Sequence, residues 1–354
     1  MNDLALSSMR CRHPATSALP GEVRRKCTLT MEEEALHWHS ARHVAGLPNV
    51  SSQWAGEPNK LTFMHCFYSQ HVGAMHVENI STSSSSASYT YVTMWKAGSS
   101  FIHQNLGASF NSSQVIGVRH PQTKGAVHGT VFTFAREPLS RFFSGATEVA
   151  WRTRLDGCTQ RAATSKCPTR KQTAQEWRAR VGDMAVSMAR NTNQSCVWRS
   201  SGAEVDVLPP PRYAEQLLQA ILNVDSDWAG FKVSHIAHLL PQVGAVNGGG
   251  WPLQFIGHTE QFAEDWASLR GRVPGGLPRF EDLDRTLGMH PTTDDPLGTK
   301  AALVALLQQQ PRLRHAICRL LQPDYKCFGY DESQCVSALQ KRGRLLPGST
   351  NQQI

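Results

Sequence analysis

The chain has 354 residues, 40% hydrophobic and 18% charged, which is enough for one large domain with a sizeable core. No window reaches the roughly 18 apolar residues that a membrane-spanning helix needs, and the first 20 residues lack a signal-peptide core. The formal net charge of +8 favours an anionic partner, but nucleic acid, phosphorylated cofactors, acidic glycans and membrane surfaces fit that charge equally.

The first third of the chain leads to one strong strand. Residues 1–60 mix Pro, Gly, Ser and charge and are predicted to form a poorly ordered N-terminal arm, with one short helix around 31–44. The serine-rich run 81–88 is predicted to be a loop. A β-branched and aromatic strand then ends at Trp95, and small residues lead into a helix with apolar residues at helical spacing.

Later segments alternate strands with helices. A strand at 130–135 precedes a helix from Pro138, and 156–176 is predicted to be a polar insertion. Further strands are expected at 230–236 and 253–258, and a helix at 300–321. The alternation predicts an α/β class with a mostly parallel sheet flanked by helices, in a single domain over 61–331. Residues 332–354 are predicted to be a C-terminal tail.

The segment "WKAGSS" places Lys96 at the mouth of a small-residue loop that opens a helix. Backbone N–H groups and the helix dipole make such a loop favourable for an anion. The chemistry is P-loop-like, although the lysine precedes the loop and the Walker spacing is absent. A surface turn with a solvated lysine is the alternative.

The segment "AREPLSRFFSG" provides a second candidate anion site. Arg136 follows a strand, and Ser144 lies eight residues further along the next helix. An arginine at a strand end binds phosphate through its forked guanidinium, and a helix hydroxyl packed across that end reaches the same group. An ion pair with Glu137 and a small packing residue are the structural alternatives. Together the two segments suggest a cofactor with two separated phosphate groups.

These motifs resemble those of the sulfotransferases. "WKAGSS" is similar to their 5′-phosphosulfate loop, and "AREPLSRFFSG" is similar to their 3′-phosphate motif. The segments "PQ…FIGHTEQFAEDW" and "CRLLQPDYKCFGYD" resemble later parts of Golgi carbohydrate sulfotransferases of the chondroitin and dermatan type. The likeness covers about residues 88 to 331 and is weak over 156–232. One departure is Trp95, which stands where the family usually has proline.

The resemblance implies a sulfotransferase fold and sulfonate transfer from 3′-phosphoadenosine-5′-phosphosulfate to an acceptor hydroxyl, leaving adenosine 3′,5′-bisphosphate. It implies the cofactor-binding residues Lys96, Ala97, Gly98, Ser99, Ser100, Arg136 and Ser144. Lys96 would also be catalytic, because its charge would stabilise the leaving group, and no metal is required.

The acceptor hydroxyl also needs a general base. The histidines between the two motifs are His103, His120 and His128, and Glu148 is a further candidate. His103 lies in the loop's own helix and is expected to be a packing or surface residue, and His128 is expected to point into or across a sheet. His120 lies in a loop able to fold over the cofactor, so we predict that it is the base; a solvent-exposed loop histidine is the alternative.

Nine cysteines and four N-x-Ser sequons favour a glycoprotein of the secretory pathway, and the resemblance implies the Golgi lumen. Buried thiols in a cytoplasmic chain, or a truncated N-terminus, are the alternatives. The expected partner is a glycan, neutral or acidic, without nucleic acid. Two further functions stay open: the same fold acting on tyrosine, a lipid or a small alcohol, and a non-catalytic nucleotide- or polyanion-binding protein.

Overall fold

A computed structural model describes the chain as a series of separate stretches. The described residues are 40–47, 74–81, 86–109, 115–118, 129–162, 198–200, 203–205, 210–222, 238–244, 251, 253–273, 277–285 and 298–340. They fall into two compact units, of which the first comprises Met1–Arg141, Pro241–Met289 and Arg312–Ile354. The second comprises Phe142–Leu240 and His290–Pro311. The limits predicted for one domain, 61–331, therefore match neither unit.

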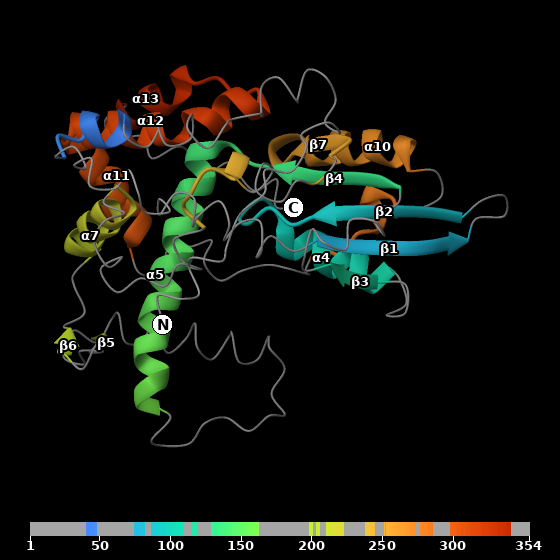
Figure 1. Cartoon of the computed structure of the whole chain (residues 1–354), viewed down its shortest axis with the longest axis horizontal. Coiled ribbons are helices and arrows are strands. Elements are labelled where there is room, and N and C mark those ends of the chain that lie inside the picture. The colour runs from blue at the N-terminus through green and yellow to red at the C-terminus, as the bar shows by residue number, and fades with distance from the viewer. Residues whose placement is uncertain are drawn as a thin grey trace, which may run out of the picture. The chain divides into compact units, whose positions relative to one another are not determined.

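The first unit contains a five-stranded sheet with the order β3-β1-β2-β4-β7 (Figure 1). Its strands are β1 (Ala74–Ser81), β2 (Ser86–Val92), β3 (Val115–Val118), β4 (Thr130–Ala135) and β7 (Phe255–His258). Strands β2, β4 and β7 run parallel, whereas β1 pairs antiparallel with both β2 and β3. The α/β class is thus confirmed, with a three-stranded parallel centre.

The prediction of a mostly parallel sheet is wrong outside that centre. Half of the four strand pairings are antiparallel. The pairing of β1 with β2 follows from their connection, because residues 82–85 are too few for a parallel crossover, which needs about a dozen residues. Neither β1 nor β3 was predicted from the sequence, because neither contains the tyrosines that mark β2.

Helices α4 (Ser99–Ser109) and α10 (Phe262–Arg272) pack against the parallel strands. Aromatic residues dominate this contact, and the Phe134 ring of β4 lies with its centroid 4.5 Å from that of Phe262. Val131 and Thr133, which alternate with Phe132 and Phe134 along β4, are buried as well. The strand is therefore covered on both faces, as is usual for parallel strands.

Gly257 in β7 is required by the neighbouring Phe134 ring. A Cβ at this position would lie 2.4 Å from Phe134 Cε1. Gly257→Ala is therefore expected to lower the free energy of unfolding by about 1–3 kcal/mol, the usual cost of overpacking, measured by urea denaturation. Gly271→Ala in α10 is the control, because its Cβ would meet nothing within 4 Å and alanine favours a helix. Equal losses in both variants would contradict the prediction.

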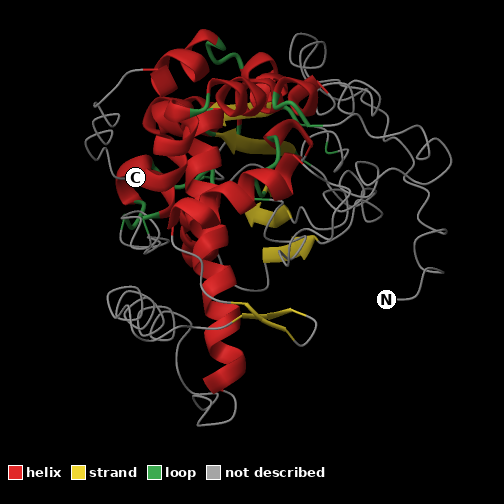
Figure 2. Ribbon diagram, turned by 90° about the vertical axis from the view of Figure 1, so that its left-hand side faces the viewer, coloured by secondary structure: helices red, strands yellow, loops and turns green. Residues whose placement is uncertain are grey.

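The remaining elements are mainly helices (Figure 2, red). They are α5 (Pro138–Ala162), α7 (Pro210–Leu222), α11 (Thr299–Gln309), α12 (Pro311–Phe328) and α13 (Ser333–Gln340), beside the short pair β5 (Trp198–Ser200) and β6 (Ala203–Val205). Proline begins α5, α7 and α12, at the position where its missing N–H costs least. The single helix predicted at 300–321 is therefore two helices, because Pro311 starts a new one. No helix among the described residues has the length and apolar character needed to cross a bilayer.

Two predicted boundaries differ from the structure, and one short helix is confirmed where it is described. Within the predicted arm, residues 40–44 are helical and belong to the helix predicted around 31–44, and Arg319 Nε of α12 donates to Ser40 Oγ at 3.2 Å. Helix α5 continues into the predicted polar insertion as far as Ala162, because propagating a formed helix needs no further apolar face. Residues 333–340 form α13 instead of a tail. A disulfide to α12 holds that helix, as described below.

Candidate functional site

The loop between β2 and α4 has an unusual backbone. Lys96 has a φ of 67° and Gly98 a φ of 71°, both in the left-handed region. The Ala97 N–H donates to Met94 O, and Gly98 O accepts from Ile102 N–H in the first turn of α4. Left-handed residues in such loops turn successive N–H groups toward one side and create a concavity that binds anions.

Lys96 adopts this conformation without being a glycine. A left-handed non-glycine residue costs of order 1–3 kcal/mol and persists only where its surroundings hold it. Gly98 suits its left-handed φ, which glycine adopts without strain. Space is not the reason for a glycine here, because the atom nearest to an added Cβ would be Thr259 Cγ2 at 3.8 Å. The strain at Lys96 is an independent indication that this loop is functional.

Arg136 lies at the end of β4, next to the same loop. Its Nη1 donates to Lys96 O at 3.4 Å, and the parallel pairing of β2 with β4 places both strand ends at one edge. Burial lowers the pKa of Arg136, and the neighbouring Glu260 and Glu137 oppose that effect. The structure therefore brings the two predicted anion-binding segments together.

The other predicted ligands with side-chain hydroxyls are serines of helices α4 and α5. Ser99 and Ser100 begin α4 and are half-buried. Ser144 is half-buried in α5 and belongs to the second unit, so its part in an anion site stays a prediction.

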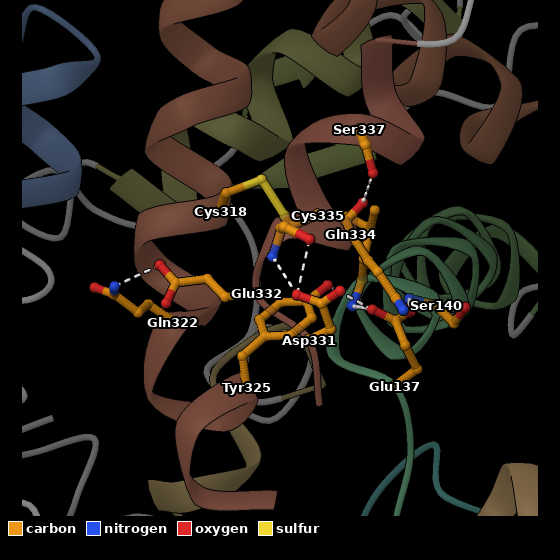
Figure 3. Close-up of a disulfide and its surroundings, with 12 residues drawn as sticks. Glu137, Ser140, Cys318, Gln322, Tyr325, Asp331, Glu332, Gln334, Cys335 and Ser337 are labelled. Atoms are coloured by element: carbon orange, nitrogen blue, oxygen red, sulfur yellow. Dashed lines mark hydrogen bonds between the residues drawn. A yellow bond between two sulfur atoms is a disulfide. The ribbon is translucent and has the colours of Figure 1, made fainter. Parts of the chain in front are cut away.

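Two glutamates lie beside Arg136: Glu137, which the sequence suggested only as an ion-pair partner, and Glu260, which it did not single out. Glu137 caps α5, where its carboxylate accepts from the N–H groups of Leu139 and Ser140 at 3.1 and 2.6 Å. It also accepts from the hydroxyl of Tyr325 in α12 (Figure 3). Each oxygen of this carboxylate is thus hydrogen-bonded, so Glu137 is held in place beside Arg136.

Glu260, just after β7, has similar partners. One of its oxygens accepts from Glu137 N–H at 2.9 Å and the other from the Tyr330 hydroxyl at 2.8 Å. Burial raises the pKa of Tyr330 and of Tyr325, and the adjacent glutamates add to the shift. Both tyrosines therefore remain protonated donors, and both glutamates have hydroxyl partners from the C-terminal segment.

Gln242 and Asp324 form a second set of supporting residues. The Gln242 side chain bonds the backbone of Arg136, and the Asp324 carboxylate bonds the backbone of Gln242 and Val243. Nearby, Arg141 Nε donates to Trp95 O at 3.0 Å, so a buried arginine holds the residue before Lys96. The segments that carried the family resemblance therefore meet around one loop.

The predicted general base cannot be placed. His120 and His128 lie outside the described residues. The half-buried His103 packs edge-on against Tyr91, and burial lowers its pKa, in keeping with a packing role. Glu148 is buried within α5.

Among the described residues, no group of three or more His, Cys, Asp or Glu side chains is arranged to hold a metal. Comparisons of the chain with protein-family models, curated proteins and solved structures gave no match. What this site binds must therefore be inferred from its motifs and its geometry.

Proposed function

We propose that the chain is a sulfotransferase that moves the sulfonate group from 3′-phosphoadenosine-5′-phosphosulfate to an acceptor hydroxyl on a carbohydrate. The observation that carries the proposal is the hydrogen bond from Arg136 Nη1 to Lys96 O. It joins the two segments that resemble the 5′- and 3′-phosphate motifs. A lysine and an arginine at neighbouring strand ends suit a ligand with two anionic groups.

The residues of the loop fit such a ligand. In this proposal the N–H groups from Ala97 to Ser100 hold the 5′-phosphate, and Arg136 holds the 3′-phosphate. The cofactor supplies an activated sulfonate group when bound. Lys96 places a fixed positive charge where the leaving oxygen becomes negative, which is the main protein contribution to this kind of transfer. His120 remains the proposed acceptor of the hydroxyl proton.

The cellular setting is part of the same proposal. Cys318 and Cys335 are joined by a disulfide, and Cys327 is disulfide-bonded as well. Disulfides persist in oxidising compartments, so they favour the secretory pathway, where glycans are sulfated. The net charge of +8 suits an acidic glycan as the acceptor.

The first experiment is a calorimetric titration with adenosine 3′,5′-bisphosphate. Wild type is expected to bind, and Arg136→Ala is expected to bind about thirtyfold more weakly, because a charged hydrogen bond worth about 2 kcal/mol is lost. Arg279→Ala is the matched control, since Arg279 is exposed and pairs only locally with Asp282. A folded wild type that ignores the ligand would overturn the proposal and leave polyanion binding in its place.

A second experiment separates the acceptor classes. Transfer of labelled sulfonate is measured to a panel of glycans, to a tyrosine peptide and to small alcohols. The proposal expects a glycan to be labelled; labelling of the peptide or an alcohol alone would keep the reaction and change the substrate class.

A further inference from the structure

Gln242 is bonded to both backbone polar groups of one residue in the anion site. The Arg136 N–H donates to Gln242 Oε1 at 3.1 Å, and Gln242 Nε2 donates to Arg136 O at 2.8 Å. This pair of bonds fixes the backbone of Arg136 just where β4 ends. Because its backbone is fixed, the side chain of Arg136 extends from a defined position to its hydrogen bond with Lys96 O.

Gln242 is in turn held by a buried acid. Asp324 is 0% exposed, and its two oxygens accept from the N–H groups of Gln242 and Val243 at 2.7 and 2.8 Å. Burial raises its pKa to about 6, and the positive charge of Arg141 and the hydrogen bonds from Gln242 and Val243 oppose the shift because they favour the ionised form. Tyr325 and Tyr330 are the other titratable groups that interact with its charge. An ionised acceptor makes the stronger hydrogen bond.

We infer that Gln242 and Asp324 are positioning residues for the anion site: Asp324 fixes the segment of Gln242, and Gln242 aims Arg136 at the bound phosphate. The inference rests on the proposed function, since Arg136 is taken as a phosphate ligand. Neither residue need touch the ligand. Their effect on affinity should pass entirely through Arg136.

A second glutamine provides a matched control on the same strand. Gln254 Oε1 accepts from Val131 N–H at 2.8 Å, near the opposite end of β4 from Arg136. It therefore makes the same kind of side-chain to backbone bond, but away from the site. A purely structural role for Gln242 predicts that neither substitution changes ligand affinity in the folded protein, although buried Gln242 costs more stability than exposed Gln254.

The test measures both stability and affinity for adenosine 3′,5′-bisphosphate. Gln242→Met is expected to weaken binding about tenfold, the equivalent of about 1.4 kcal/mol, whereas Gln254→Met leaves affinity within twofold of wild type. Asp324→Asn, which keeps the shape but not the charge, is expected to weaken binding in the same direction. It also replaces Gln242→Met if that variant does not fold.

A double-mutant cycle shows whether the effect passes through Arg136. In the Arg136→Ala background, Gln242→Met is expected to change affinity less than twofold. If Gln242→Met weakens binding equally in both backgrounds, or as little as Gln254→Met does, the positioning role is overturned while the proposed function stands. If wild type itself does not bind, the proposed function and this inference fall together.

Discussion

Lys96→Met is expected to slow sulfonate transfer about a hundredfold to a thousandfold, the usual cost of removing one group that stabilises transition-state charge. Methionine keeps the length of the side chain but lacks its charge. Affinity for adenosine 3′,5′-bisphosphate should fall less than the rate, because the charge matters most once the leaving oxygen becomes negative. The measurement is the turnover number with labelled cofactor and a glycan acceptor at saturation.

The left-handed backbone of Lys96 supplies a sharper control for this prediction. Lys96→Gly removes the same charge but relieves the strain at a φ of 67°, so its stability should equal or exceed that of Lys96→Met. Both variants should lose turnover alike if the charge is the cause. Lys300→Met changes an exposed lysine of α11 and should behave as wild type. Full turnover in either Lys96 variant would show that the loop binds without catalysing.

Removing the disulfide between α12 and α13 is expected to lower the free energy of unfolding by about 3 kcal/mol. Cys318 and Cys335 lie 17 residues apart in the sequence, so their bond closes a loop that restricts the unfolded chain. The variant is Cys318→Ala with Cys335→Ala, because both positions are buried and alanine adds no polar group there. Guanidinium denaturation provides the measurement.

Gln334→Ala, at an exposed position of α13, is the control for the disulfide variant and should change stability by less than about 0.5 kcal/mol. A double-alanine variant as stable as wild type would mean that helix packing alone holds α13. The closed loop also contains Tyr325, which donates to Glu137 at the start of α5 (Figure 3). Some loss of ligand affinity should therefore accompany the loss of stability.

Local sequence pattern was enough to predict much of the secondary structure around the two segments of the proposed anion site. The strand at 130–135, the helix start at Pro138 and the helix after Gly98 are confirmed. The strand before Lys96 exists, but it begins at Ser86, inside the predicted serine-rich loop, and ends at Val92 instead of Trp95. Each of these features depends on neighbouring residues: β-branched runs, small residues and proline. Two such segments on parallel strands meet at one edge of the sheet, so their proximity also followed from the predicted class.

The supporting residues could not be found in the same way. Gln242 and Arg136 are 106 residues apart, and Glu137 and Tyr325 are 188 apart. A bond from a side chain to a distant backbone group leaves no periodic pattern in either segment. The resemblance marked the segments around Gln242 and Tyr325, but not what those residues hold. The left-handed φ of Lys96 was also unpredictable, because sequence preference assigns that conformation to glycine.

Because these hydrogen bonds join residues far apart in the sequence, they cannot form until late in the synthesis of the described residues. When a ribosome has translated residue 300, both segments of the proposed anion site are complete, but α12 does not yet exist. The supporting residues of the C-terminal segment are among the last described residues to emerge. Asp324 bonds Gln242, Tyr325 bonds Glu137 and Tyr330 bonds Glu260. A nascent chain thus carries every proposed phosphate ligand well before it has the residues that set them in place, so the proposed site is complete only once residue 330 has emerged.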